Sequence, residues 1–261
     1  MRFRHNMHIH TFRSNCGQPE MVIADIVERA EGAALEVIGL VDHVDLGAAK
    51  EIAALHADRR DVERLRPALK VLVGTEVTML SPRRLAITPE QAQGLDFVMV
   101  AANHFHLREI VEQPTSDSPQ AFAEHALAML QGAIETGMAD IIAHPLVAKT
   151  GVLAFEPERL ITELTSERLA PVLIKAAQRG TAMELNPWLA AQFPAFYAVF
   201  IAACKEHGVR FALGSDAHRL ENIPYAGSGV HRGAGPDDLE ALGVRESDLV
   251  EPLTAFSRQR R

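Results

Sequence analysis

The chain has 261 residues, of which 48% are hydrophobic, and its formal net charge is -8 with a pI of about 5.8. This acidic balance argues against a general nucleic-acid-binding surface, and two cysteines are too few for a disulfide framework. No apolar run approaches the roughly 20 residues that a membrane-spanning helix needs, so we expect a cytoplasmic protein. The length fits a single domain over residues 1–261, with a barrel over about 3–218 and a helical extension over about 219–261.

Predicted strands and helices alternate along the chain. After a first strand that ends at His8-Ile9-His10, apolar runs predict strands at 35–41, 69–73, 95–101, 139–143, 181–185 and 209–213. Helical periodicity predicts helices at 19–33, 48–65, 89–93, 120–136, 156–179 with a break near Pro171, 195–207, 236–242 and 249–257. This alternation is typical of an α/β fold whose parallel strands are joined by right-handed crossovers. About seven strands fit a closed or nearly closed barrel, and a doubly wound open sheet is the alternative.

Histidines and carboxylates occur where the predicted strands end. His8 and His10 lie two residues apart, so both side chains leave the first strand on the same face. Further metal-binding side chains follow the later strands, namely His43, Glu76, His104, His144, Asp216 and His218. The carboxyl ends of parallel barrel strands meet at one mouth, so we expect these residues to lie together.

The composition of this set narrows the chemistry. Imidazoles together with carboxylates suit Zn, Mn or Fe, since Mg and Ca prefer oxygen ligands alone. Eight ligands are too many for one tetrahedral ion, and a carboxylate can bridge two ions. Two-metal sites of this kind activate a water for in-line displacement. The residues therefore predict a multinuclear metal-dependent hydrolase.

The same positions carry a resemblance to a known family. The motifs His8-x-His10, Asp42-His43, Gly74-Thr75-Glu76, Asn103-His104, Ala143-His144-Pro145 and Ser215-Asp216-Ala217-His218 resemble, in order, those of the polymerase-and-histidinol-phosphatase (PHP) family. The resemblance covers residues 6 to about 218. It implies a distorted seven-stranded (β/α) TIM-like barrel with its metal site, for two or three divalent metal ions, at the C-terminal ends of the strands. It also implies hydrolysis of phosphate esters, commonly phosphomonoesters.

The resemblance further implies a distribution of ligands over three ions. The first ion would be held by His8, His10, Glu76 and Asp216. Glu76 would bridge to a second ion held by His104 and His144, and His43 and His218 would bind a third. In family members with three metals, one more histidine comes from the loop after the first strand, where Cys16 stands here. A thiolate binds zinc well, so Cys16 is either a ligand of the third ion or a bystander, and the sequence leaves both readings open.

These assignments lead to a hypothesis for catalysis. Water activated between ions bridged by Glu76 would attack phosphorus, and His218 or His43, if not fully occupied by metal, would protonate the leaving oxygen. Asp42 either orients a neighbouring ligand or caps a turn. The candidates for binding a small phosphorylated metabolite, such as histidinol phosphate, are Arg13, His106, Lys149 and Arg219. The oligomeric state is not indicated by the sequence.

Three other functions share some of these features. Barrel amidohydrolases also use His-x-His, later histidines and a late aspartate to cleave C–N or ester bonds. Glu76 and the Asp216-Ala217-His218 ending fit the phosphoesterase pattern better. A nuclease role is disfavoured by the acidic charge, and a non-catalytic metal-binding module would need a closed ligand set without an exchangeable water.

Overall fold

The computed structural model describes residues 4–146, 155, 158–223 and 235–256. The strands of this part of the chain are β1 (His5–Ile9), β2 (Val37–Leu40), β3 (His43–Val44), β4 (Lys70–Val73), β5 (Glu76–Ser81), β6 (Arg84–Leu85), β7 (Met99–Ala101), β8 (Ile141–Ile142), β9 (Ala182–Leu185) and β10 (Phe211–Leu213). Its α-helices are α1 (Ile23–Gly32), α2 (Ala49–Leu65), α3 (Pro119–Glu135), α4 (Glu158–Glu163), α5 (Ser166–Arg179), α6 (Pro187–Gln192), α7 (Pro194–Glu206), α8 (Pro236–Ala241) and α9 (Pro252–Ala255). Two short 3-10 helices also occur in this part of the chain. η1 (Leu220–Asn222) follows β10, and η3 (Glu246–Asp248) lies between α8 and α9.

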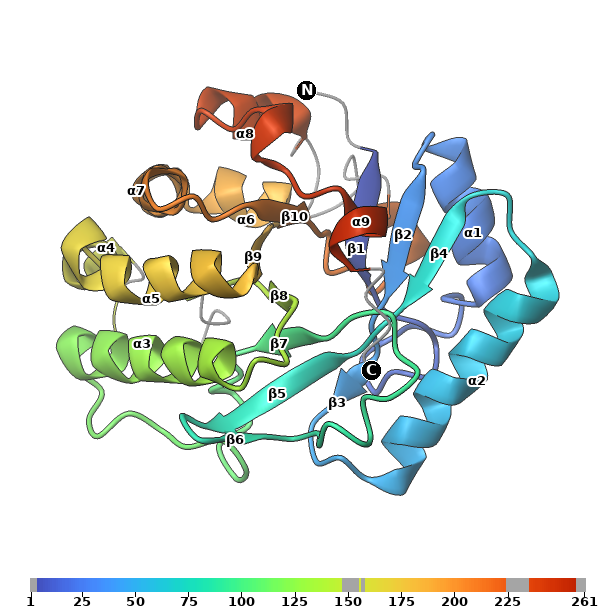
Figure 1. The fold of residues 1–261 in the computed structure, drawn as a ribbon, viewed down its shortest axis with the longest axis horizontal. Coiled ribbons are helices and arrows are strands. Elements are labelled where there is room, and N and C mark those ends of the chain that lie inside the picture. Colours follow the sequence, from blue (N-terminus) through green and yellow to red (C-terminus); the bar gives the residue numbers. More distant parts are fainter. Residues whose placement is uncertain (1–3, 147–154, 156–157, 224–234, 257–261) are drawn as a thin grey trace.

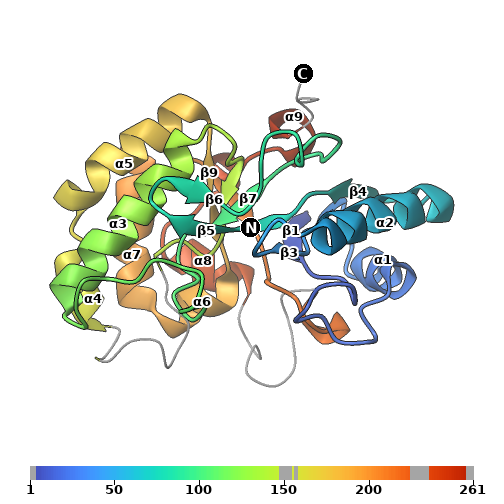
Figure 2. The ribbon, with the colours of Figure 1, turned by 90° about the horizontal axis from the view of Figure 1, so that it is seen from below.

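The strands pair in parallel, as the alternating sequence pattern predicts. One sheet has the order β1-β2-β4, and the other has the order β10-β9-β8-β7-β5-β3. The added strand β6 pairs antiparallel with β5 and is the exception among the described strands. Helices α1 and α2 lie beside β2 and β4, whereas α3, α5 and α7 lie on the other side of the molecule (Figure 1). Figure 2 shows the strands between these two groups of helices.

More strand segments are present than the seven that the sequence predicts. The run 35–41 is interrupted at Val41 and Asp42 and continues as β3. The run 69–73 likewise breaks at Gly74-Thr75 and resumes as β5, over residues for which the sequence predicts no strand. The α/β class and the parallel pairing are confirmed, while the regular closure of a barrel is not. Between β1 and the segment after β10 the described ladder reduces to one parallel bridge, Ile9–Ala217.

Buried polar contacts reinforce that seam. His10 N donates to Ala217 O at 3.0 Å, and Ala217 N donates to His8 O at 3.1 Å. The fully buried Asn6 side chain adds three bonds, because Nδ2 donates to Ser215 Oγ at 2.7 Å and to Ile223 O at 3.0 Å, and Oδ1 accepts from Ser215 N at 3.1 Å. The start of the chain is thereby tied to the segment that carries Asp216.

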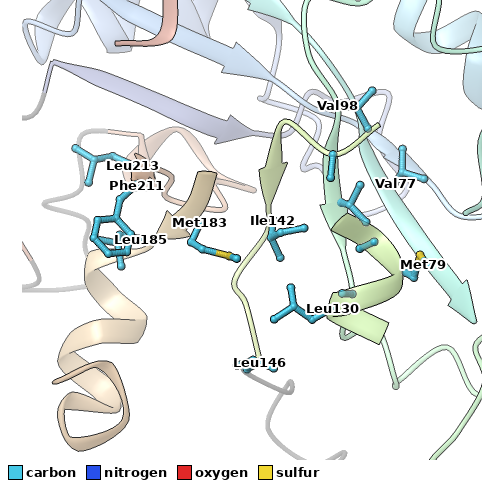
Figure 3. Close-up of a cluster of buried hydrophobic side chains, with 14 of the residues drawn as sticks. Val77, Met79, Val98, Leu130, Ile142, Leu146, Met183, Leu185, Phe211 and Leu213 are labelled. Carbon is cyan, nitrogen blue, oxygen red and sulfur yellow. The ribbon is translucent and has the colours of Figure 1, made fainter. Parts of the chain in front are cut away.

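Two groups of buried apolar side chains fill the molecule. The larger one joins the strands to the helices, as where Leu130 of α3 lies near Ile142 of β8 (Figure 3). The smaller one takes members from β1, β2, β4, β7, β8, β9 and β10, so it lies on the other face of these strands. Phe256, just after α9, belongs to this inner cluster and stacks on Phe97 with ring centroids 5.6 Å apart. Successive side chains on a strand point to opposite faces, which explains why one set of strands supplies both clusters.

The helices depart from the predictions in three places. The predicted break near Pro171 does not occur there, since α5 continues through this proline. The helix over 156–179 instead divides between α4 and α5, where the Thr165 side chain accepts a hydrogen bond from Arg168 N and caps the second helix. Residues 89–93 form turns rather than a helix, and α6 follows Asn186, whose side chain caps it. No helix in the described part of the chain is both long and apolar enough to cross a bilayer.

Burial of His5 in β1 gives the fold a pH dependence. His5 Nε2 accepts a hydrogen bond from Leu213 N at 3.0 Å, and burial lowers the pKa of His5 from 6.5 to about 4. The folded state therefore prefers the neutral ring. The free energy of unfolding is not reduced by His5 above pH 6.5, and it decreases as the pH falls from 6.5 toward 4. The difference between the two pKa values corresponds to about 3 kcal/mol of unfolding free energy.

We expect His5→Gln, which keeps a neutral acceptor but does not titrate, to lose stability less steeply over this pH range. Urea unfolding of chelator-treated wild type and variant at pH 7, 6, 5 and 4 measures the difference. Parallel curves for the two proteins would contradict the assignment.

Candidate metal centre

The predicted ligands come together at one end of the strands. His8 belongs to β1 and His10 follows it directly, and both are fully buried. His43 and Glu76 are the first residues of β3 and β5, and they are register partners in this parallel pair. The other members follow β7, β8 and β10, namely His104, His144, Asp216 and His218.

Glu76 lies at the centre of the cluster, and its two oxygens face different histidines. Oε1 is 2.9 Å from His144 Nε2 and 3.4 Å from His104 Nε2. Oε2 is 3.2 Å from His43 Nδ1, 3.4 Å from His8 Nε2 and 3.5 Å from His10 Nε2. The carboxylate therefore separates two groups of nitrogens, with one oxygen for each group.

Asp216 completes the group around the first strand. Its Oδ1 lies 3.1 Å from His10 Nε2 and 3.3 Å from His8 Nε2, and the two imidazole nitrogens are themselves 3.1 Å apart. Asp216 has a positive φ of 52°, which is uncommon for a residue other than glycine. Such backbone strain is concentrated at functional sites, where the surrounding contacts hold it in place.

Hydrogen bonds behind two of the rings fix which nitrogen carries the proton. The Thr78 hydroxyl donates to Asp45 Oδ1 at 2.6 Å, so its oxygen accepts from His104 Nδ1 at 2.7 Å. His218 Nδ1 donates to the Asp216 carbonyl at 2.8 Å. In both rings the proton is on Nδ1, which leaves the lone pair of Nε2 available to a cation.

The same arrangement holds for His144. The Asn103 amide nitrogen donates to His144 O at 2.9 Å, which identifies Asn103 Oδ1 as the acceptor for His144 Nδ1 at 3.1 Å. His144 Nε2 is then the ring nitrogen that faces Glu76 Oε1, at 2.9 Å. Rings held in this way by acceptors at Nδ1 are characteristic of histidines that bind metals through Nε2.

The electrostatics of the cluster also favour a cation. Burial alone would raise the pKa of Glu76, but His43 and His8 hold it well below its ordinary range, and His8 and His10 do the same for Asp216. Burial lowers the pKa values of His10 and His43 to about 4. Among the described residues, His10 Nδ1, His43 Nδ1 and Glu76 Oε2 are buried without a hydrogen bond. Despite burial, Glu184 raises the pKa of His8 and Glu76 raises that of His144. Ionised carboxylates beside the neutral rings of His10 and His43, which have unused lone pairs, fit divalent metal ions.

Cys16 lies within a second group of possible ligands. Its sulfur and nitrogens of His10, His43 and His218 all lie within 4.8 Å of one another. Ser14 Oγ is 3.2 Å from the sulfur, and burial raises the pKa of the thiol to about 12. The thiol therefore keeps its proton near neutral pH unless a cation replaces it.

The loop that carries Cys16 is fastened to its surroundings by charged groups. Asp42 accepts hydrogen bonds from Thr11 N and Thr11 Oγ1, both at 2.6 Å, so this carboxylate holds the loop. Arg13 donates to Asp58 Oδ1 at 2.6 Å and to Asp61 Oδ2 at 2.5 Å, both on α2. The guanidinium of Arg13, a predicted phosphate ligand, thus has its charge matched by two carboxylates of the helix.

The other predicted substrate-binding residues have different surroundings. His106 is exposed, and its ring contacts that of His104 at a centroid distance of 5.1 Å. Arg219 is exposed beside His218, at the start of η1. Lys149 lies outside the described residues.

Glu184 is a residue that the sequence reasoning missed. It is fully buried in β9, with Oε1 2.8 Å from His8 Nδ1 and Oε2 2.5 Å from His144 N. The available signal was a charged residue within the buried apolar run Thr181–Leu185. Buried carboxylates are rare unless they are paired, so a glutamate in a buried strand is itself a candidate site residue.

Comparisons with known proteins agree on the fold. No family model matches the sequence, and no curated protein sequence matches it. Among solved structures, histidinol phosphate phosphatase from Lactococcus lactis, in complex with zinc, L-histidinol and phosphate, has a TM-score of 0.59 at 14% identity, covering 93% of this chain and 94% of that one. A putative histidinol phosphatase from Listeria monocytogenes has a TM-score of 0.54 at 15% identity, covering 84% and 97%.

A third similar structure comes from the metal-dependent tyrosine phosphatases YwqE of Bacillus subtilis and CpsB of Streptococcus pneumoniae. It has a TM-score of 0.51 at 18% identity, covering 98% of this chain and 95% of that one. At such identities the likeness concerns the fold alone. These neighbours are phosphatases, and the described residues of this chain include histidine and glutamate groups that are spaced to hold a metal ion.

Proposed function

We propose that this protein is a metal-dependent phosphoesterase of the PHP type that hydrolyses a small phosphorylated metabolite. The observation that carries the proposal is the position of Glu76, whose oxygens face two separate groups of histidine nitrogens. A carboxylate in that position would bridge two ions. The phosphatase neighbours support the choice of phosphate esters, and histidinol phosphate is the first substrate to test because two of those neighbours are histidinol phosphatases.

The proposed ligands follow from the geometry. His8, His10, Asp216 and Glu76 would hold one ion, and Glu76, His104 and His144 would hold the second. Divalent ions in such a site acidify water and neutralise charge on phosphoryl oxygens. Zinc is the first ion to test because the Lactococcus lactis structure contains it.

Other residues of the chain would handle substrate and proton. The side chain of His218 is 34% exposed, which is more than that of any other histidine in the cluster, and its Nδ1 proton is fixed by Asp216 O. Where His218 holds no ion, we therefore assign its Nε2–H to protonation of the leaving oxygen. Arg219 and His106 are exposed next to ligands and are assigned to the phosphate and its substituent.

A substrate screen tests the proposed function directly. Purified protein loaded separately with Zn, Mn or Fe is assayed for phosphate release from histidinol phosphate, other phosphorylated metabolites and an aryl phosphate, with an aryl amide and single-stranded DNA as alternatives. Release of phosphate that requires metal supports the proposal. Cleavage of the amide or the DNA with no phosphate release, or a metal-loaded protein inactive on every substrate, contradicts it.

Cys16 allows a separate test for a third ion. We propose that its thiolate, with His43 and His218, binds that ion, because the four ligand atoms of this group lie within 4.8 Å of one another. Cys16→Ser should then bind one fewer ion per chain, and Cys16→His should restore it. Elemental analysis gives the stoichiometry, and thiolate-to-cobalt charge-transfer absorption in the cobalt-loaded wild type identifies the sulfur ligand. Cys204→Ala, which removes the buried thiol on α7, is the matched control. An unchanged stoichiometry in Cys16→Ser would show that the thiol is a bystander.

A further inference from the structure

The carboxylate of Glu184 contacts one ligand of each of the two proposed ions, His8 and His144. β9 lies next to β8 and β10 in the sheet, and Glu184 is its only charged residue. One oxygen, Oε1, accepts from the His8 ring, and the other, Oε2, accepts from the backbone N–H of His144. His8 belongs to the first proposed ion and His144 to the second. Neither Glu184 oxygen is solvent-exposed, since the residue has no accessible surface.

The contact with His8 determines the state of that ring. An imidazole can carry its single proton on either nitrogen, and only the form protonated on Nδ1 presents a lone pair at Nε2. Glu184 Oε1, 2.8 Å from Nδ1, selects this form, while Nε2 lies 3.3 Å from Asp216 Oδ1 and 3.4 Å from Glu76 Oε2. Without an acceptor at Nδ1, the proton would compete for the position that a cation needs.

The contact with His144 determines the backbone of the other ligand. His144 has a positive φ of 31°, and the residue two positions later, Leu146, has a φ of 64°. Such conformations are costly for residues with a Cβ and persist when contacts hold them. The bond from His144 N to Glu184 Oε2 is one such contact, and the bond from Asn103 Nδ2 to His144 O is another, while Asn103 Oδ1 holds the ring.

The chemistry of the two partners requires a carboxylate at this position. Both partners donate, so the residue between them must accept at each of its two ends. Glutamine has the same shape, but its amide nitrogen would face either His8 Nδ1–H or His144 N–H as a second donor. Gly214 leaves room for the carboxylate, because a Cβ at that position would lie only 1.9 Å from Glu184 Oε1.

We propose that Glu184 is a positioning residue that prepares both ion sites at once, by fixing the tautomer of His8 and the backbone of His144. This inference rests on the proposed function, because it assigns the two histidines to two different ions. Its consequence is specific. Loss of the carboxylate should weaken both ions together, whereas loss of a residue that supports one ligand should weaken one.

Cobalt titrations of the metal-free full-length chain test this without any substrate. In the wild type we expect one binding phase in the visible absorption for each of the two ions that His8 and His144 would hold, separate from the thiolate charge-transfer band of a third ion at Cys16. In Glu184→Gln both phases should weaken, each by about 10- to 100-fold. Asn103→Ala removes contacts to the ring and carbonyl of His144, which belongs to the second proposed ion, so it should weaken one phase. Asp140→Asn is the matched control, because this carboxylate accepts from the backbone N of Val98, at 2.8 Å, and Val98 is not a proposed ligand.

The possible outcomes separate this inference from the proposed function. A wild type that binds no cobalt or zinc contradicts the proposed function itself. A wild type with two phases that are unchanged in Glu184→Gln, or of which only one weakens, contradicts the role of Glu184 alone. If Glu184→Gln does not fold, the ring nitrogen resonances of the zinc-loaded wild type decide. A His8 proton on Nδ1 supports the inference, and a proton on Nε2 overturns it.

Discussion

Replacement of Glu76 by glutamine should lower kcat/KM for a phosphomonoester by about 10,000-fold, which corresponds to about 5 kcal/mol of transition-state stabilisation. The reason is the central position of the carboxylate, which lies within 3.5 Å of nitrogens of five histidines. Glutamine keeps the shape but removes the negative charge that would bridge two ions. Elemental analysis after dialysis should therefore also show a loss of bound metal.

A matched substitution controls for the change from glutamate to glutamine. Glu112, whose side chain is 54% exposed and faces His125, is remote from the proposed ligands, so Glu112→Gln should keep wild-type activity and metal content. Steady-state kinetics and metal content are measured together on both variants. A Glu76→Gln protein that retains its metal and loses less than about tenfold in rate would exclude the bridging role.

A methyl group added at Gly214 should disturb the fold and the candidate site together. In Gly214→Ala the new Cβ would lie 1.9 Å from Glu184 Oε1 and 2.8 Å from the Cβ of His8. Both neighbours are fully buried, so neither side chain has free space to occupy. We expect a loss of about 3 kcal/mol of unfolding free energy, in the upper range for overpacked cores. For a chain of this size, that corresponds to a decrease in Tm of roughly 6–12 °C.

The position of the clash gives a second readout for the same variant. Because the Glu184 carboxylate must move, cobalt affinity should fall along with Tm. Gly32→Ala is the control, since a Cβ there meets no atom within 4 Å and the residue ends helix α1. That variant should unfold within about 1 °C of the wild type or above it. Wild-type Tm and cobalt affinity in Gly214→Ala would show that the region between Gly214 and Glu184 tolerates the added methyl group.

The ligand positions were predictable because they depend on a local rule. Side chains that follow parallel strands collect at one edge, so His104, His144 and Asp216 could be placed together without knowing any contact. His43 and Glu76 obey the rule in a modified form. Each begins a new strand segment after a break, which the apolar pattern alone does not reveal. Whether these residues bind metal stays a prediction.

The supporting contacts could not be predicted in the same way. Glu184 lies within a strand, and its partners come from β1 and from the segment after β8, so no spacing in the sequence links them. Arg13 illustrates the same difficulty for charge. Its position after the first strand suggested a phosphate ligand, but two aspartates one turn apart on α2 lie within 2.6 Å of its guanidinium. Which charged groups pair with one another depends on tertiary packing, and the hydrophobic periodicity of the sequence does not reveal it.

The seam between Asn6 and Ser215 also has a consequence for how the chain is made. These two residues are 209 positions apart, so on the ribosome β1 has a neighbour on one side only until the later segment is synthesised. At about 5–20 residues per second this takes roughly 10–40 seconds. During that interval the edge of β1 and its two buried histidines are open to other strands in the cell. Nascent chains of this protein are therefore candidate clients for chaperones that shield exposed strand edges.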